Sequence, residues 1–283
     1  MKNQPENTAN LEKVKEIRNT SVLFSENKST GRVIETIKTS FNHIKSLNNH
    51  NISINTLDYT QLGPSGQDEI KTARDKDFIR FESGIRESRP GDSKYLRFNL
   101  PKEEKDYRVE LAHRNQFGMN TDSSYEFQMQ VDQAARSAIF FQVKETGGNM
   151  KNSEGSRPPV SLTVKNNNEI FVSINTDSGN VLRKKIAVLE NPQDWNKFKI
   201  RIVWNRENPL VNISIDGNNV FEYTKPFGAH NSVYHYSKFG VYIPQQKSQE
   251  GIRDTSLLFD NFRESHREFK SPDNSSGNSG IRS

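Results

Sequence analysis

The stretch YHYSKFGVYIPQQ, residues 234–246, decides the fold class because apolar and polar residues alternate along it. Successive side chains of a β-strand point to opposite faces. One face therefore carries the core-forming residues Phe239, Val241 and Ile243. The opposite face carries three tyrosines, a lysine and a glycine: Tyr234, Tyr236, Lys238, Gly240 and Tyr242. The glycine leaves room for another group to approach the backbone. The stretch therefore predicts a strand with one apolar, core-facing side and one side that carries phenol groups and an ammonium group.

The same two-residue period recurs after residue 77, with turn residues between most of the segments. The predicted strands are residues 78–81, 95–100, 107–113, 124–131, 138–144, 160–164, 169–174, 181–189, 198–204, 211–215, 220–223 and 256–262. The pair Asp216-Gly217 between two of them is a hairpin signal. Many short strands without interleaved helices predict an all-β, two-sheet sandwich of the jelly-roll, concanavalin-like type.

The first 70 residues have a different pattern. Apolar residues at spacings of three and four predict an amphipathic helix over residues 30–47, capped by Ser29 or Thr30, and a shorter helix over residues 11–18. Residues 48–68 are rich in Asn, Gly, Ser and Thr, which predicts a linker. We therefore expect a helical, polar N-terminal extension over residues 1–70, a β-domain over residues 71–270 and a disordered tail over residues 271–283. The extension could be a packed appendage, a partner-binding helix or a secretion leader.

Composition limits the classes of protein. The 283 residues are 31% hydrophobic and 27% charged, which suits one sizeable domain with polar extensions. The absence of cysteine excludes disulfides and thiolate chemistry. No apolar run is long enough to span a membrane, and the N-terminus lacks the apolar segment of a signal peptide. We expect an extracellular or phage-associated protein that uses no conventional signal peptide, with a cytoplasmic location left open.

A formal net charge of +5 favours polyanionic partners. The six histidines show no metal-ligand spacing, and no phosphate-binding loop or nucleophile elbow is present. We expect no structural metal and no cofactor, although calcium stays possible, and we expect a monomer. Nucleic-acid binding would use the same positive charge, but the aromatic residues match no RNA-binding signature.

Two further predicted strands divide their side chains as residues 234–243 do. In one, Val109 and Leu111 face one side while Arg108 and Glu110 face the other. In the other, strict alternation places Ile139, Phe141 and Val143 on one side and Phe140, Gln142 and Lys144 on the opposite side. If the three strands share a sheet, one groove is lined by Arg108, Gln142, Lys144, Tyr236, Lys238 and Tyr242. Cations and amides bind carboxylates and aromatic rings pack on sugar rings, so the groove suits a chain of acidic sugars.

These residues carry a family resemblance. Residues 108–111, RVEL, resemble the R-[ST]-E-L strand of jelly-roll alginate lyases, residues 142–144 lie where those enzymes have Q-[IV]-H, and residues 236–242 match their Y-x-K-x-G-x-Y. The related group of heparin lyase I and glucuronan lyase is closer still. Residues 89–98 resemble its R-x-G-k-x-l-r-f segment, and residues 195–217 resemble its tryptophan strand and I-D-G hairpin. The resemblance covers residues 78–262.

The resemblance implies β-elimination at a uronic acid of an anionic polysaccharide. Arg108, Gln142 and Lys144 would neutralise the carboxylate and stabilise the developing enolate. Tyr242 would be the acid and could also be the base, with Lys238 lowering its pKa. The implied substrate contacts are Glu110, Tyr234, Tyr236, Lys238 and Gln245.

One position departs from the family pattern, because Lys144 replaces a histidine that is commonly assigned as base or carboxylate neutraliser. A lysine with an ordinary pKa of about 10.4 is a poor base near neutral pH unless it is buried. Three explanations remain open. Tyr242 makes both proton transfers, or His113 or His235 enters the groove although alternation places both on the core side, or the protein is a non-catalytic carbohydrate-binding jelly roll.

Overall fold

In the computed structural model, every β-strand lies between Arg32 and Phe269 in the described part of the chain. The structure describes residues 32–39, 50–55, 79–86, 89–100, 107–113, 115–134, 137–147, 157–243 and 254–269. The helix expected at residues 11–18 and the tail at residues 271–283 lie outside these residues. None of the described elements is a helix that could cross a membrane.

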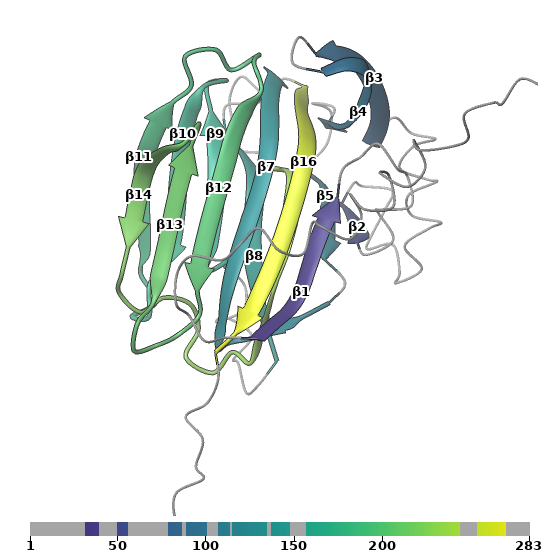
Figure 1. Cartoon of the computed structure of the whole chain (residues 1–283). Coiled ribbons are helices and arrows are strands. Elements are labelled where there is room, and N and C mark those ends of the chain that lie inside the picture. The colour runs from purple at the N-terminus through teal and green to yellow at the C-terminus, as the bar shows by residue number, and fades with distance from the viewer. Residues whose placement is uncertain are drawn as a thin grey trace, which may run out of the picture. The chain divides into compact units, whose positions relative to one another are not determined.

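The described strands form two eight-stranded antiparallel sheets (Figure 1). Sheet A has the order β14-β13-β12-β7-β16-β4-β3, and β1 also pairs with β16. Its strands are β1 (Arg32–Thr39), β3 (Ile79–Arg86), β4 (Arg89–Leu100), β7 (Thr121–Gln133), β12 (Asn196–Val203), β13 (Leu210–Ile215), β14 (Asn218–Tyr223) and β16 (Thr255–Glu268). The all-β sandwich expected from the alternation is therefore confirmed.

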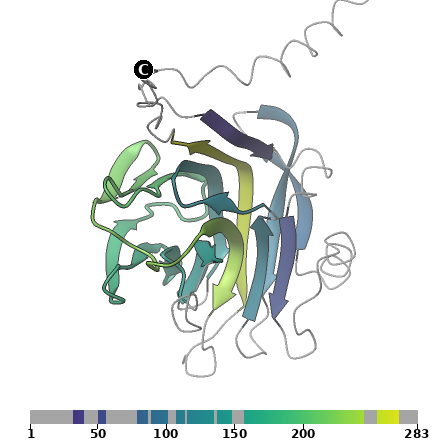
Figure 2. The same cartoon turned by 90° about the horizontal axis from the view of Figure 1, so that it is seen from below.

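Sheet B has the order β11-β10-β9-β8-β15-β5-β2, and the short β6 also pairs with β15. Its strands are β2 (His50–Asn55), β5 (Tyr107–His113), β6 (Phe117–Gly118), β8 (Ser137–Thr146), β9 (Val160–Lys165), β10 (Glu169–Asn175), β11 (Val181–Val188) and β15 (Tyr234–Ile243). Figure 2 shows β5 and β2 of this sheet side by side. The three strands with polar faces, β5, β15 and β8, are consecutive in sheet B, as the sequence pattern required.

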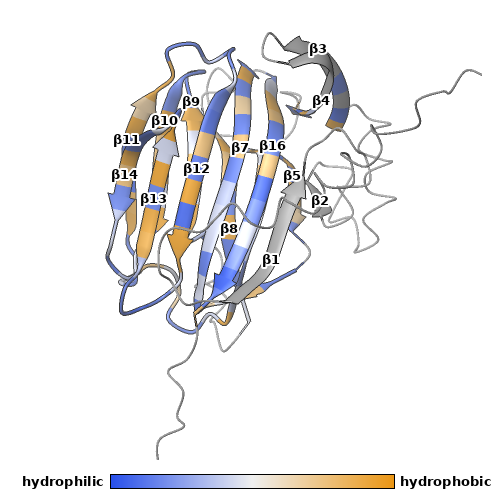
Figure 3. Cartoon of the chain, in the orientation of Figure 1, coloured by the Kyte–Doolittle hydropathy of each residue, from blue (hydrophilic) through white to orange (hydrophobic). Residues whose placement is uncertain are grey.

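The core lies between the sheets and is built from the alternating apolar residues. Phe239, Val241 and Ile243 of β15 are completely buried, in agreement with the prediction. Phe239 stacks on Phe262 of sheet A with ring centroids 4.2 Å apart. Apolar and polar bands alternate along the strands in Figure 3, which reflects this one-sided burial. Each large apolar side chain buried in this way stabilises the fold by about 1.5–3 kcal/mol.

The predicted hairpin at Asp216-Gly217 is also confirmed. β13 and β14 pair on either side of it, and both turn residues have positive φ, 50° for Asp216 and 85° for Gly217. This geometry matches the primed two-residue turns that Asp-Gly favours.

The helix expected at residues 30–47 is wrong where the structure describes it, because Arg32–Thr39 forms β1. Part of the expected linker, His50–Asn55, forms β2. The segment RVIETIKT is rich in β-branched residues, which favour strands. β1 pairs with β16 and β2 pairs with β5. These are long-range contacts, which the local spacing of apolar residues cannot predict.

A β-bulge in β8 changes which side chains face the core, so the faces predicted for Ile139 and Phe140 are wrong. The register against β9 shifts between Ile139 and Phe141, so one residue is inserted. Phe140 consequently joins Phe141 in the core, where its ring lies 5.3 Å from that of Phe198. Ile139 pairs instead with Tyr242, on the outward side. Strict alternation had placed these two residues the other way round.

Gly240 is required by the neighbouring strand. It has φ of 137°, and a Cβ there would lie 2.3 Å from the carbonyl oxygen of Val109 and 3.0 Å from the ring of Phe98. The group that approaches the backbone at this glycine is therefore β5, together with a core side chain of sheet A.

Gly240→Ala is expected to lower the free energy of unfolding by at least about 3 kcal/mol, because it combines backbone strain with overlap on a strand that cannot move alone. Chemical denaturation would measure the loss. Gly118→Ala is the matched control, since no atom lies within 4 Å of a Cβ at that position. Equal stability of the two variants would contradict the role given to Gly240.

A polar network is buried in the core between β7, β15 and β16. The carboxylate of Glu264 accepts hydrogen bonds from Ser237 Oγ at 2.7 Å and from His266 Nε2 at 2.8 Å. Ser123 Oγ lies 2.9 Å from the other nitrogen of His266. Burial alone would raise the pKa of Glu264, but the hydrogen bonds and the neighbouring imidazoles lower it to about 2. The carboxylate therefore stays ionised inside the sandwich.

His235 lies beside this network and is completely buried. Its Nε2 is 2.9 Å from Thr121 Oγ1, and that hydroxyl already donates to the Gly118 carbonyl oxygen. Nε2 must therefore carry the proton. The imidazole ring of His235 stacks on the Trp204 ring, with centroids 4.4 Å apart. Burial, with a smaller contribution from His266, lowers the pKa of His235 well below its usual value.

These shifts predict loss of stability in acid. The unfolded chain binds a proton at His235 below about pH 6.5, whereas the folded chain does not, so this contribution to stability is complete above pH 6.5 and falls as the pH drops. Glu264 adds a second loss between its unfolded pKa of about 4.3 and about 2. His235→Phe is expected to remove the first loss, of up to about 1.4 kcal/mol per pH unit, in urea titrations between pH 6.5 and 5. If the free energy of unfolding falls equally with pH in the wild type and in His235→Phe, this role for His235 is excluded.

Candidate active site

The candidate site lies on the outward side of three consecutive strands of sheet B. β15 pairs with β5 on one edge and with β8 on the other. Its Tyr242 lies opposite Arg108, and its Lys238 lies opposite Gln142. Directly paired residues project from the same face of a sheet. We call this surface the polar face: Arg108, Glu110, Gln142, Lys144, Tyr236, Lys238 and Tyr242.

Glu110 is the hub of the polar face. Its side chain is completely buried, and Arg108 Nε lies 2.8 Å from Oε2. Gln142 Nε2 donates a hydrogen bond to Oε1 of the same carboxylate. The carboxylate therefore holds a guanidinium from its own strand and an amide from β8, two strands away. The ion pair and the hydrogen bond to one buried carboxylate fix the orientation of both partners.

Each tyrosine of the motif has a cation on its ring. The guanidinium of Arg108 lies 4.1 Å from the ring centroid of Tyr242. The ammonium of Lys238 lies 5.9 Å from the ring of Tyr236. Arg108 is therefore the cation that lies against Tyr242, where the sequence predicts Lys238. Burial raises the pKa of Tyr236, whose phenol stays protonated.

Lys144 has a lowered pKa on the polar face. It lies opposite Tyr236 on β15. Partial burial, followed by the charges of Lys238 and Arg108, lowers the pKa of Lys144 to about 8. Burial also lowers the pKa of Lys238. A neutral amine is therefore accessible at Lys144 near pH 8, which an ordinary lysine would not provide.

The histidines expected on the core side are found there. His113 and His235 are both buried, with exposed fractions of 3% and 0%. Their rings pack around Phe117 between the sheets. The structure therefore removes the explanation in which one of them enters the site as base.

The remaining predicted residues are less central. Tyr234 begins β15 and is 43% exposed. Gln245 lies outside the described residues.

Glu145, next to Lys144, accepts hydrogen bonds from the Ala229 amide and the Ser232 hydroxyl, which fixes the loop that leads into β15.

The outward side of sheet B extends beyond the residues predicted from the sequence. Directly paired residues form a row across the outward side of sheet B. The row runs from Arg108 through Tyr242 and Ile139 to Thr163 of β9 and Phe171 of β10. Phe171 occupies the polar parity of β10, where Ile170, Val172 and Ile174 form the core face. An aromatic residue on the solvent parity of a strand was the signal that could have identified it.

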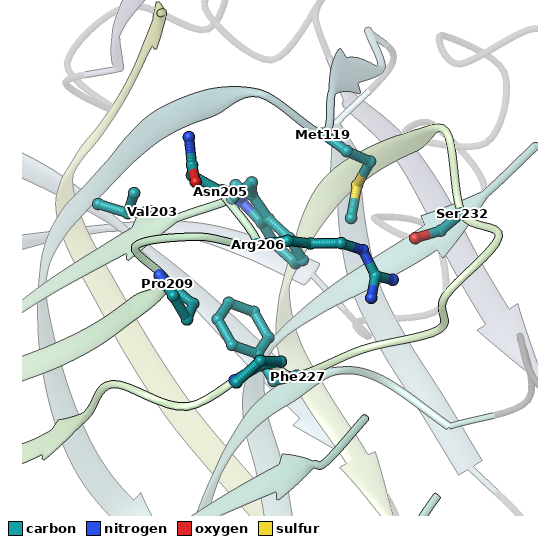
Figure 4. Close-up of a pocket in the computed structure, with 9 residues that line it drawn as sticks. Met119, Val203, Asn205, Arg206, Pro209, Phe227 and Ser232 are labelled. Atoms are coloured by element: carbon teal, nitrogen blue, oxygen red, sulfur yellow. The ribbon is translucent and has the colours of Figure 1, made fainter. Parts of the chain in front are cut away.

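A separate pocket lies elsewhere in the molecule (Figure 4). Met119, Trp204, Arg206, Phe227 and Ser232 are among the residues that line it, and none belongs to the polar face. Its volume of about 40 Å³ admits a few water molecules but no sugar ring. The pocket therefore does not compete with the polar face as a site for a polymer.

The lowered pKa of Lys144 predicts a measurable coupling. Lys238→Met removes a neighbouring positive charge, so the pKa of Lys144 is expected to rise from about 8 by up to about 1 unit. Titration of lysine side-chain NMR signals would follow it. Lys185→Met, at the far edge of the sheet, is the control and should leave the value unchanged. A wild-type Lys144 that titrates near 10.5 would contradict the burial assigned to it.

Solved structures show the same architecture. A glucuronan lyase from Trichoderma reesei aligns with a TM-score of 0.53 at 13% identity, over 66% of this chain and 86% of its own. An alginate lyase from Pseudomonas aeruginosa aligns with a TM-score of 0.55 at 16% identity, over 78% of this chain and 99% of its own. An exolytic alginate lyase from Zobellia galactanivorans aligns with a TM-score of 0.53 at 13% identity, over 83% of this chain and 99% of its own. At these identities the likeness shows a shared fold.

Sequence comparison supplies the family. No curated protein sequence matches the chain. The family model described as polysaccharide lyase matches residues 71–263, which is more than half of the chain and includes every described residue of the polar face. The chain therefore belongs to the polysaccharide lyase family.

Proposed function

We propose that this lyase cleaves a uronic-acid-containing anionic polysaccharide by β-elimination on the polar face. The observation that carries the proposal is the grouping of Arg108, Gln142, Lys144 and Lys238 near the buried carboxylate of Glu110, with Tyr242 against the Arg108 guanidinium. Acidic sugars are also the substrates named for the structurally similar glucuronan and alginate lyases. A polyanion suits the positive surface, and a tyrosine supplies proton transfer.

Carboxylate neutralisation falls to Arg108 and Gln142, and also to Lys144 if Tyr242 is the base. Arg108 Nε faces Glu110, so its two terminal nitrogens are the ones that can bind a uronate carboxylate. One amide hydrogen of Gln142 is committed to Glu110, which leaves the other for the substrate. These donors lower the energy of the enolate that forms when the proton on carbon 5 is removed. Both carboxylate oxygens of Glu110 are occupied by Arg108 and Gln142, so we assign Glu110 a positioning role in place of the expected substrate contact.

The elimination then needs two proton transfers. A base removes the proton from carbon 5, the electron pair forms the double bond between carbons 4 and 5, and the bridge oxygen leaves carbon 4 with a proton from an acid. We assign the acid to Tyr242. Lys144, with a pKa of about 8, and Tyr242 itself are the two candidates for the base. Tyr234, Tyr236 and Lys238 are assigned to substrate contact, and Gln245 stays a prediction.

The test is ultraviolet absorbance at the wavelength of the unsaturated uronate product. Wild-type protein would be incubated with alginate, glucuronan, heparin, hyaluronan and bacterial capsules. Product is expected from at least one uronate polymer, and Tyr242→Phe should lower kcat at least about a hundredfold, because the phenol proton is lost. Absorbance that does not rise with any polymer, with binding retained, would identify a carbohydrate-binding jelly roll in which Lys144 marks lost chemistry.

The pH profile separates the two candidate bases. If Lys144 is the base, kcat/KM of the wild type rises through about pH 8, and Lys144→His moves that limb toward about pH 6.5. If the limb stays in place in Lys144→His, Tyr242 makes both transfers. A monomeric state, the absence of a cofactor and an extracellular or phage-associated location stay predictions.

A further inference from the structure

A second charged and aromatic cluster lies on the same outward side of sheet B, at its β9–β11 end. Phe171 of β10 is half-buried, and cations from the two neighbouring strands lie on its ring. Lys165 Nζ of β9 is 4.5 Å from the ring centroid, and Arg183 Cζ of β11 is 5.6 Å from it. Cation–π contacts of this kind orient both cations without neutralising their charge. We call these three residues the Phe171 cluster.

The register connects this cluster to the polar face without a break. One row of paired residues runs across six strands: Lys185, Phe171, Thr163, Ile139, Tyr242 and Arg108. A second row contains Arg183, Ser173, Ser161, Gln142 and Lys238. With strands about 4.8 Å apart, Phe171 lies roughly 14 Å from Tyr242 along the sheet. Ser161 and Thr163 of β9 lie between them, and both short side chains are buried.

Charge identifies what the cluster would bind. Arg183 is exposed and forms no ion pair with a carboxylate among the described residues. Lys185, by contrast, is paired with Glu169 at 3.0 Å. An exposed guanidinium held against an aromatic ring retains donors for an external carboxylate. A polymer with a carboxylate on successive sugars would present one such group here while another is held at Arg108.

We propose that the Phe171 cluster is a distal subsite that binds a uronate several sugars away from the bond that is cleaved. The inference rests on the proposed function, since it assigns this surface to the same polymer. It makes the enzyme selective for chain length, because a short oligosaccharide that fills the Tyr242 region does not reach Arg183. Binding at the subsite contributes to affinity for the polymer and leaves the chemical step unchanged.

The experiment compares Arg183→Ala and Phe171→Ala with a control on the same strand. Lys184 is exposed like Arg183 but points to the opposite side, toward the ring of Phe221 at 5.8 Å. Lys184→Ala therefore removes the same charge without touching the subsite. For a polymer that the wild type cleaves, both subsite variants are expected to raise KM about three- to tenfold with unchanged kcat. The shortest cleavable oligosaccharide should be processed at wild-type rates, and Lys184→Ala should behave as wild type on both.

Two results would overturn the subsite. One is an equal effect of Arg183→Ala and Lys184→Ala on the polymer, and the other is a loss that is the same at every chain length. Failure of the proposed function has a different signature, because wild type would then form no unsaturated product from any polymer. In that case the Kd for the same uronate polymers still decides the inference, since a subsite predicts weaker binding by Arg183→Ala than by Lys184→Ala.

Discussion

The double pairing of β15 is the constraint on which the site depends. Its two edges hydrogen-bond to β5 and β8, so residues more than a hundred positions apart in sequence are brought to one surface. Gly240 permits this pairing, because any Cβ there would overlap β5. The same strand fills the core through Phe239, Val241 and Ile243. Stability and chemistry are therefore set by opposite faces of a single strand.

Alternation was sufficient to predict most of the fold. Burial on one face is a local property of a sequence, so the strands of the polar face and the division of their side chains could be derived without coordinates. The buried positions of His113 and His235 followed from the same rule. β1 could not be derived in this way, because its apolar spacing fits a helix and its pairing with β16 is a long-range contact.

The remaining differences arise where a strand departs from regular geometry or where two distant strands meet. The bulge in β8 moved Phe140 into the core and Ile139 outward, and nothing in the residue pattern marks an inserted residue. The pKa of Lys144 depends on its burial and on Lys238 and Arg108, which belong to other strands. The relation between Phe171 and Tyr242 requires the register of four strands. Sequence could name these residues one at a time, but it could not supply their distances.

The clustering of positive charge has a consequence for how such a protein can change. Arg108, Lys144 and Lys238 repel one another, which adds to burial in lowering the pKa of Lys144, and Glu110 is the one buried carboxylate in the described part of the polar face. Neutral substitutions at these lysines would therefore relieve repulsion and favour folding while they remove affinity for a polyanion. Mutational drift toward greater stability would lead away from activity. A variant selected for heat resistance alone is thus liable to keep the sandwich and lose its substrate.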